Sequence, residues 1–186
     1  MKRLAITPLP LSGLMLVERQ RLSDARGFLS RLFCAQELLA AGWTKPIAQI
    51  NHSYTARSGT VRGMHFQRAP HGEMKLVSCV RGEVWDVAVD LRAGSPSFLH
   101  WHAERLSADN GRALLIPQGC AHGFQALTDD VELLYCHSAA YSAAADAGLD
   151  PCDARLGIDW PRAITELSAR DAGHPGIDAA FEGVTA

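Results

Sequence analysis

The sequence predicts an all-β fold, a double-stranded β-helix or jelly roll with a few short peripheral helices. Three observations lead to this prediction: short runs of β-branched and alternating residues recur, clusters of Gly, Pro, Asn, Asp or Ser separate them, and helical patterns are few. With 186 residues, 47% of them hydrophobic and 20% charged, the chain can form a substantial core. We therefore expect a single domain over residues 1–186, with a C-terminal extension of about residues 139–186 packing on it.

The expected strands are bounded by turn-forming residues along most of the chain. They are Leu14–Glu18, Phe28–Phe33, Ile47–Tyr54, Gly59–Gln67, Met74–Val80, Glu83–Leu91, Phe98–Leu106, Arg112–Ile116, Gly123–Leu127 and Val131–Ser138. The clearest is Glu83–Leu91, because every second residue from Trp85 is apolar and the other face carries two aspartates. This alternation predicts a strand with one exposed face.

Helices are expected at two places only. At Ala35–Gly42, good helix formers precede a glycine in the C′ position. After Ala139 the strand pattern weakens, and Pro161–Ala169 has a short helical tendency.

The charge pattern excludes some classes of partner. The formal net charge is -2, the pI is about 6.4, and no long block of like charges occurs. This balance favours neither nucleic acid nor an acidic membrane surface as a partner, although a charged small ligand remains possible.

The cysteines and the N-terminus indicate a cytoplasmic protein. Five cysteines occur without a CxxC pair, so we expect reduced, mostly buried thiols. Pro8, Pro10 and Gly13 interrupt the first apolar stretch before it could act as a signal sequence, and no segment is long enough to span a membrane.

The segment Gly59–Val89 combines residues that suit proton abstraction. His65 alternates to one side of its predicted strand with Val61, Gly63 and Gln67, and Lys75 shares a face with Val77 and Cys79 in the next strand. An imidazole can accept a proton near neutral pH, and an ammonium group can stabilise an oxyanion. A buried lysine on an apolar strand also normally has a charged partner or a function.

This segment is one of four blocks that together resemble a known family. The others are IPQGCAHGF at Ile116–Phe124, LLYCHSAAYS at Leu133–Ser142, and LGIDWP followed by LSARDA within Leu156–Ala172. In this order they resemble the dTDP-4-dehydrorhamnose 3,5-epimerases of deoxysugar biosynthesis. The resemblance runs from about Leu14 to Ala172 and implies a cupin-like jelly roll that epimerises a nucleotide-diphospho-4-keto-6-deoxy sugar at C3, C5 or both, without a cofactor.

The resemblance also implies the catalytic residues. His65 matches the base that removes the proton beside the ketone, and Asp171 the carboxylate that orients it. Lys75 matches the group that stabilises the enolate, and Tyr135 the acid that returns a proton from the opposite face. Two groups on opposite faces of the sugar are what inversion requires.

Eight further positions match residues that bind the substrate. Arg62 corresponds to the arginine that contacts the diphosphate, for which a planar guanidinium is well suited. The others are Arg26, Gln49, Asn51, His122, Tyr141, Asp146 and Arg170.

Some positions depart from the family pattern. Arg31 stands where relatives carry a glutamate against the nucleoside, and Arg170 replaces a lysine. Asp146 replaces a glutamate that contacts the ligand, and Ala140 replaces one of two adjacent tyrosines. A dTDP sugar is the first expectation, and a CDP or GDP sugar is an alternative, as is a 3-epimerase or ketoisomerase acting on such a sugar.

A metal-dependent cupin isomerase or dioxygenase is a second alternative. The histidines and Glu73 follow the cupin metal motifs only in part, because Gln67 replaces the second histidine. Leu99–Glu104 also places two histidines and a glutamate on one strand face, which is a weaker candidate. We therefore predict no metal site. A non-catalytic sugar-nucleotide binding module is a third alternative, against which the four catalytic groups argue.

A homodimer is expected, mainly because the resemblance implies pairing through an N-terminal strand. The apolar stretch Leu9–Val17 could supply that strand edge.

Overall fold

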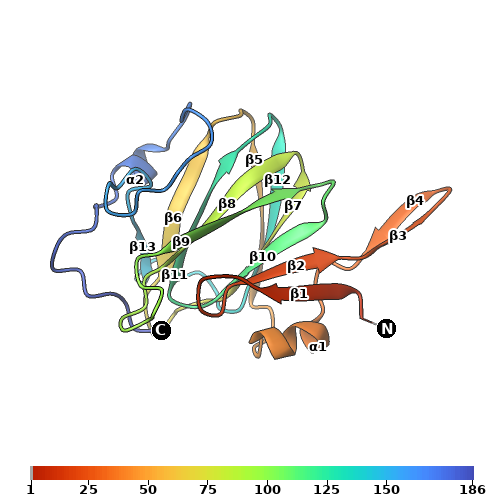
Figure 1. The fold of residues 1–186 in the computed structure, drawn as a ribbon, viewed down its shortest axis with the longest axis horizontal. Helices are drawn as coiled ribbons and strands as arrows, with labels where there is room; N and C mark the ends of the chain where they lie inside the picture. Colours follow the sequence, from red (N-terminus) through yellow and green to blue (C-terminus); the bar gives the residue numbers. More distant parts are fainter. Residues whose placement is uncertain (1) are drawn as a thin grey trace.

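The computed structural model describes residues 2–186 and confirms the all-β prediction (Figure 1). Two antiparallel sheets face each other. The six-stranded sheet has the order β1 (Leu4–Pro8), β2 (Met15–Arg19), β10 (Arg112–Ile116), β7 (Lys75–Arg81), β12 (Val131–His137), β5 (Gln49–Thr55). The five-stranded sheet has the order β13 (Asp146–Gly148), β6 (Val61–Gln67), β11 (Cys120–Ala126), β8 (Glu83–Asp90), β9 (Trp101–Ser107). A separate hairpin joins β3 (Arg21–Asp24) to β4 (Gly27–Ser30).

Every predicted strand overlaps an observed one, and three short strands escaped prediction. These are β1, β3 and β13, of which β13 has three residues and β3 is largely polar. Strands as short as β3 and β13, with four and three residues, carry too few alternations to stand out from loop sequence.

The helix predicted at Ala35–Gly42 is present, as α1 (Ala35–Leu38) followed by a 3-10 turn, η1 (Leu39–Ala41). Gly42 ends it with φ 94°, a left-handed conformation that glycine adopts without steric cost. The helical tendency predicted at Pro161–Ala169 is wrong. That segment is neither helix nor strand, and its backbone bonds to Gly59 and Val61 at the start of β6. The helix α2 (Ala169–Ala172) begins only at its end. No helix within residues 2–186 has the length and apolar character needed to cross a bilayer.

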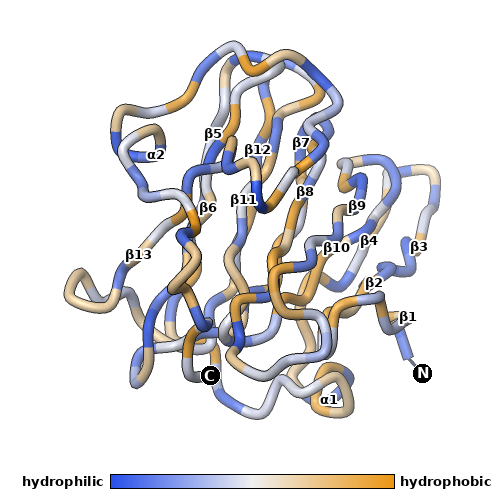
Figure 2. The backbone as a smooth tube through the Cα atoms, turned by 60° about the vertical axis from the view of Figure 1, so that its left-hand side comes forward, coloured by the Kyte–Doolittle hydropathy of each residue, from blue (hydrophilic) through white to orange (hydrophobic). Residues whose placement is uncertain are grey.

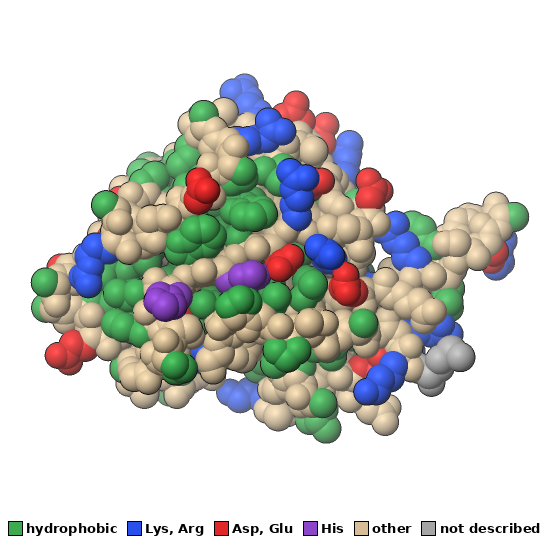
Figure 3. All heavy atoms as spheres, viewed as in Figure 1, with side chains coloured by type: hydrophobic (Ala, Val, Ile, Leu, Met, Phe, Trp, Pro, Cys, Tyr) green, Lys and Arg blue, Asp and Glu red, His purple; other side chains and the backbone are tan. Residues whose placement is uncertain are grey.

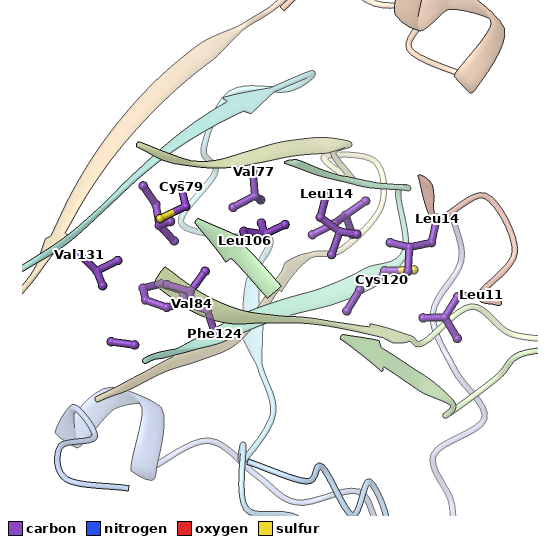
Figure 4. Close-up of a cluster of buried hydrophobic side chains, with 14 residues drawn as sticks. Leu11, Leu14, Val77, Cys79, Val84, Leu106, Leu114, Cys120, Phe124 and Val131 are labelled. Atoms are coloured by element: carbon purple, nitrogen blue, oxygen red, sulfur yellow. The ribbon is translucent and has the colours of Figure 1, made fainter. Parts of the chain in front are cut away.

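The central core lies between the two sheets. Figure 4 shows buried side chains from both sheets meeting there, including Val77, Leu114 and Phe124. The outer face of the six-stranded sheet packs on α1 and η1, whose hydrophobic residues are orange in Figure 2. The outer face of the five-stranded sheet packs on the C-terminal segment through residues such as Leu156 and Ile177.

The prediction of a half-exposed β8 is wrong, because the C-terminal segment covers its apolar face and its aspartate face lies toward the core between the sheets. Most of β8 is buried, and Asp86 and Asp90 on its polar face have no solvent exposure. Both carboxylates are hydrogen-bonded, Asp86 to His122 and Asp90 to Arg92 and two serines. A buried carboxylate is tolerated when such partners replace water.

A β-bulge in β6 changes which side chains face inward. His65 pairs with His122 on β11, whereas Arg62 pairs with Phe124, so two residues of β6, at positions 63 and 64, lie opposite one residue of β11, at position 123. Directly paired residues point to the same side of a sheet, so both Arg62 and His65 face inward with their partners. Strict alternation had placed Gly63 on the side of His65 and Arg62 on the other. Gly63, within the bulge, has φ +126°, and a Cβ there would lie 2.5 Å from the Cα of Gly123.

The apolar stretch Leu9–Val17 does not form the free strand edge that the sequence suggested for a dimer. Leu11, Leu14 and Val17 are buried within the chain, and β2 lies between β1 and β10, so Leu9–Val17 offers no free edge. The β3–β4 hairpin instead projects from the body and carries hydrophobic side chains (Figures 1 and 3). Phe28 and Leu29 on it are 60% and 71% exposed.

Candidate active site

A pocket of about 1090 Å³ opens between the two sheets, with the segment before α2 at its rim. Strands β5, β7 and β12 form one wall, and β6 and β11 form the other. Ten of the residues singled out from the sequence line it: Asn51, Arg62, His65, Lys75, His122, Tyr135, Tyr141, Asp146, Arg170 and Asp171. The fold therefore brings the four predicted catalytic side chains into one space.

His65 and Asp171 form a hydrogen-bonded pair at this pocket. The Nε2 atom of His65 lies 2.7 Å from Oδ1 of Asp171, and the backbone N–H of Gly63 donates to Oδ2 over 3.2 Å. Asp171 is held in α2, where Ser168 caps the helix by accepting a hydrogen bond from the Asp171 backbone N–H. Both carboxylate oxygens are thus fixed by protein groups.

The protonation of this pair follows from its surroundings. Burial opposes the ionisation of Asp171, but the hydrogen bonds from His65 and Gly63 outweigh it and lower the pKa of this carboxyl. An ionised carboxylate only accepts, so Nε2 of His65 carries the proton and Nδ1 keeps its lone pair. Burial lowers the pKa of His65 from its ordinary 6.5, and Asp171 partly opposes this shift. The imidazole is therefore neutral at pH 7 and able to act as a base.

Tyr135 lies on the opposite wall, in β12. Its hydroxyl is 3.2 Å from Oγ of Ser53, and its ring stands edge-on to His122 at 5.9 Å between centroids. Burial raises the pKa of Tyr135, with a smaller contribution from the charge of Asp86. The phenol consequently keeps its proton at neutral pH and can donate it.

Lys75 is buried in β7 with its ammonium group held by two oxygens. Nζ lies 3.3 Å from Oε1 of Glu73 and donates to the backbone carbonyl of His65 over 3.2 Å. An ammonium group has three N–H donors, so one is left for a ligand oxygen. A neutral base, a protonated phenol and a cation around one pocket are the groups that an enolisation and reprotonation need.

Comparison with known proteins agrees with this geometry. A sequence model of the family described as dTDP-4-dehydrorhamnose 3,5-epimerase matches residues 8–179. The chain belongs to this epimerase family. A dTDP-4-dehydrorhamnose 3,5-epimerase from Streptomyces griseus is 41% identical over 172 residues, which cover 91% of this chain and 85% of the relative. A dTDP-4-dehydrorhamnose 3-epimerase from Streptomyces niveus is 40% identical over 167 residues, covering 89% and 80%.

Solved structures of the epimerase family share the fold. The structure of a dTDP-6-deoxy-D-glucose-3,5-epimerase from Legionella pneumophila, in complex with dTDP-4-keto-L-rhamnose, superposes with a TM-score of 0.90 at 34% identity. The superposition covers 98% of this chain and 99% of that chain. The cupin-like jelly roll expected from the sequence is therefore the observed architecture.

The predicted substrate-binding residues divide into pocket, rim and distant groups. Arg62 lines the pocket and is steadied by Oγ1 of Thr55 and the carbonyl of Tyr54, which leaves other guanidinium N–H groups free to bind a phosphate. Gln49 lies just outside and accepts from the backbone N–H of Tyr141 while donating to Asn51.

Three predicted ligand contacts form a network at the mouth of the pocket. The carboxylate of Asp146 accepts from the Tyr141 hydroxyl at 3.3 Å and forms an ion pair with Arg170. Tyr141 is 58% exposed, so this network lies at the solvent edge of the pocket.

Arg26 does not reach the pocket of its own chain. It lies at the turn of the β3–β4 hairpin, where its side chain is 90% exposed and pairs with Asp24. Arg31, which departs from the family pattern, pairs with Glu37, and Glu37 also accepts from the backbone of Arg3 and Leu4. Within this chain, Glu37 therefore fastens the N-terminal strand to α1, and Arg31 adds an ion pair to this contact.

Several pocket residues escaped prediction. They are Ser53 and His137, together with Asp86 behind His122. Glu73, considered from the sequence only as part of a cupin metal motif, also lines the pocket. His137 lies two residues beyond Tyr135, and Glu73 two before Lys75, so strand periodicity could have placed each pair on one face. His122 is nearly buried, with Nε2 donating to Asp86 over 2.8 Å.

Two of the cupin metal positions, Gln67 and Glu73, are held by other groups of the protein. The side chain of Gln67 donates to the carbonyls of His71 and Ala140 and accepts from the N–H of Ser142. Glu73 is likewise held in an ion pair with Lys75. These contacts do not suit the donor set of a metal-dependent cupin.

The second metal candidate, Leu99–Glu104, is also not assembled. His102 bonds Glu104 at 3.0 Å, whereas His100 is exposed before β9 begins. Within residues 2–186, the one group of three side chains that could share an ion is His65, Asp171 and His174. Two of these already form the catalytic-type pair at hydrogen-bond distance.

Proposed function

We propose that this protein is an epimerase of a dTDP-4-keto-6-deoxyhexose, acting in deoxysugar biosynthesis without a cofactor. The observation that carries the proposal is that the His65–Asp171 pair and Tyr135 lie on opposite walls of the same pocket. The relatives from Streptomyces and the Legionella structure with its dTDP-4-keto sugar support the nucleotide and the keto group.

In the first step, Nδ1 of His65 takes the proton from a carbon next to the ketone. The C–H electron pair moves into a carbon–carbon double bond, and the ketone oxygen becomes an enolate oxygen. Asp171 stabilises the imidazolium that forms, and the free N–H of Lys75 donates to the enolate.

In the second step, Tyr135 delivers its hydroxyl proton to the other face of the same carbon. The double bond reverts to the ketone, and the carbon is left with inverted configuration. The phenolate formed is stabilised by Ser53 and regains a proton from solvent, while His65 releases the proton that it took. A second cycle at the other carbon flanking the ketone would give a 3,5-epimerase, and a single cycle a monoepimerase.

The diphosphate would bind at Arg62, where the bulge in β6 turns the guanidinium toward the pocket. Asn51 and His122 line the same pocket, and the network of Asp146, Tyr141 and Arg170 would close its mouth over the ligand. Gln49 supports this mouth through its bond to the Tyr141 backbone.

We also propose that the protein is a cytoplasmic homodimer. Exposed hydrophobic residues on the projecting β3–β4 hairpin, Leu22, Phe28 and Leu29, would be covered by a second copy. Such pairing would let Arg26 act on the pocket of the partner rather than on its own. A cytoplasmic location would keep the five cysteines in the free form that they have here.

The proposal is tested by incubating the protein with dTDP-4-keto-6-deoxyglucose in heavy water and following the sugar by NMR. Deuterium at C3, C5 or both, together with an inverted product, is the expected result. The position of the label also decides between one and two inverted centres. The same incubation with CDP and GDP sugars, and a metal analysis of the protein, address the alternatives. Absence of exchange with all three nucleotides, or stoichiometric iron or manganese that the exchange requires, would refute the proposal.

A further inference from the structure

Two neighbouring strands of the pocket wall place a histidine directly opposite the catalytic-type lysine. His137 on β12 is the register partner of Lys75 on β7, so their side chains point to the same side of the sheet. Glu73, just before β7, joins them. Its Oε1 is 3.3 Å from Nζ of Lys75 and its Oε2 is 2.8 Å from Nδ1 of His137.

All three side chains are nearly withdrawn from water, with exposures of 8% for Glu73, 9% for Lys75 and 10% for His137. Burying a charge is costly unless an opposite charge and hydrogen bonds compensate it. Burial opposes ionisation of Glu73, but the bond from His137 and the charge of Lys75 outweigh it and lower the pKa of this carboxyl. Glu73 is therefore the counter-charge of the buried ammonium group.

The bond from His137 gives this carboxylate one orientation. A carboxylate held at a single oxygen can rotate, whereas one held at both oxygens is fixed in its plane. Lys75 has a flexible four-carbon side chain, and its ammonium group is located by Oε1 of Glu73 and the carbonyl of His65. The direction of the third N–H follows from these two contacts.

The histidine also contacts the phenol on the same strand. The rings of His137 and Tyr135 stack with centroids 6.1 Å apart and planes 24° apart. His137 thus touches the proton donor through its ring face and the lysine through Glu73. Its Nδ1 donates to the ionised Glu73, and within residues 2–186 its buried Nε2 has no hydrogen-bond partner.

We infer that Glu73 and His137 are positioning residues for the epimerisation: through the carboxylate they hold the Lys75 ammonium where the enolate oxygen develops. This inference rests on the proposed function. Glu73 supplies both the negative charge that keeps the buried ammonium stable and the oxygen that aims it. His137 keeps the carboxylate in the plane that this aim requires.

The experiment compares two single variants in the presence and in the absence of the lysine. Glu73→Gln keeps the size and a hydrogen-bonding oxygen but removes the charge. His137→Phe keeps the stacking on Tyr135 but removes the donor to Glu73. Each is made in the wild-type chain and in a Lys75→Met background, and deuterium exchange into the dTDP-4-keto sugar is measured at high enzyme concentration. Thermal unfolding of every variant controls for folding.

We expect Glu73→Gln to lower kcat for exchange about 10- to 100-fold with little change in KM, because a misdirected donor affects the transition state more than binding. His137→Phe should lower kcat about 3- to 10-fold, because the hydrogen bond that orients the Glu73 carboxylate is lost. In the Lys75→Met background, neither change should reduce the remaining rate by more than about twofold, because residues that act through one group are not additive.

Three results would overturn the inference. Losses of equal size with and without Lys75 would show that Glu73 and His137 support the fold or act independently. Wild-type kcat in folded Glu73→Gln protein would show that the counter-charge is dispensable. If the wild-type protein gives no exchange at all, the proposed function fails and this inference fails with it, whereas the first two results leave the proposed function intact.

Discussion

Nε2 of His65 and Oδ1 of Asp171 are 2.7 Å apart although 106 positions separate the two residues in the chain. The contact forms because α2, in the C-terminal segment, lies against β6 and carries Asp171 to it. The backbone of Gly63 holds the second oxygen of the same carboxylate. The orientation of the His65 imidazole therefore depends on a segment that follows all the strands in the chain.

His65→Ala should abolish deuterium exchange. General bases typically contribute about 100- to 10,000-fold, and within residues 2–186 His65 is the one histidine at hydrogen-bond distance from Asp171. NMR of the 4-keto sugar in heavy water gives the rate. Binding of dTDP, measured by calorimetry, should remain close to that of the wild type. Exchange at the wild-type rate would remove His65 as the base.

The exchange rate should decline in acid at a pH below 6.5. The pKa of His65 is lowered from 6.5 by burial, so the neutral base persists to lower pH than for a free imidazole and is lost only as the pH falls through the lowered value. Asp171 raises this pKa, and its replacement in Asp171→Asn should move the acid limb to lower pH. The same variant should lower the plateau about 100-fold, because the tautomer is no longer fixed. If the fall of the rate in acid moved to higher pH in Asp171→Asn, His65 would not be the group that titrates.

Tyr135→Phe should separate the two proton transfers. The variant keeps the base and Lys75, so deuterium should still enter the substrate by exchange on one face. Inversion, followed by the appearance of the epimer, should fall by about 100-fold or more because the donor on the other face is missing. Ser53→Ala is a control that retains the phenol and loses only its hydroxyl partner. Equal losses of exchange and inversion in Tyr135→Phe would indicate a different role.

Gly63→Ala should destabilise the protein by about 3 kcal/mol or more, since its Cβ would lie 2.5 Å from the Cα of Gly123 and 2.8 Å from the carbonyl oxygen of His122. Gly94→Ala is the matched control. Gly94 also has a positive φ, +71°, but a Cβ there meets nothing within 4 Å, so only the backbone cost of about 1 kcal/mol is expected. Denaturant unfolding measures both. Equal costs at the two positions would mean that the bulge can relax.

Leu29→Asp should shift the protein from dimer to monomer in light scattering. Leu29 is 71% exposed on the projecting hairpin, so a charge there costs little in the isolated chain and much in an apolar interface. Leu39→Asp, at a residue 58% exposed on η1, is the control and should remain dimeric. Affinity for dTDP should weaken in the monomer because Arg26 no longer reaches a second pocket. A monomeric wild-type protein would exclude this arrangement.

Much of the architecture could be predicted from the sequence because the central strands are long enough to show a period of two. Arg112–Ile116 is predicted with the observed bounds, and the glycine at position 42 marks the helix end. That Lys75, Tyr135 and His65 meet in one pocket could be predicted from the family resemblance but not from the periodicity. No local pattern indicates which strands become neighbours.

The failures have identifiable causes. The aspartates of β8 suggested exposure, because a sequence does not show that His122 and Arg92 will neutralise them in the interior. Regular alternation placed Arg62 away from His65, because a one-residue irregularity in β6 leaves no signature beyond its glycine. The hairpin position of Arg26 could not be foreseen, because β3, the strand before it, has only four residues and is largely polar.

The additional residue in β6 lets Arg62 and His65 face the same side of the sheet. Without it, a regular strand would present either the guanidinium of Arg62 or the imidazole of His65 to the pocket. Under the proposed function, the strand could then bind the diphosphate or transfer a proton, but not both. Deleting one residue at Gly63–Met64 would turn the remaining half of the strand over. The number of residues in β6 between Arg62 and His65 thus decides whether the proposed phosphate-binding group and the proposed base face the same pocket.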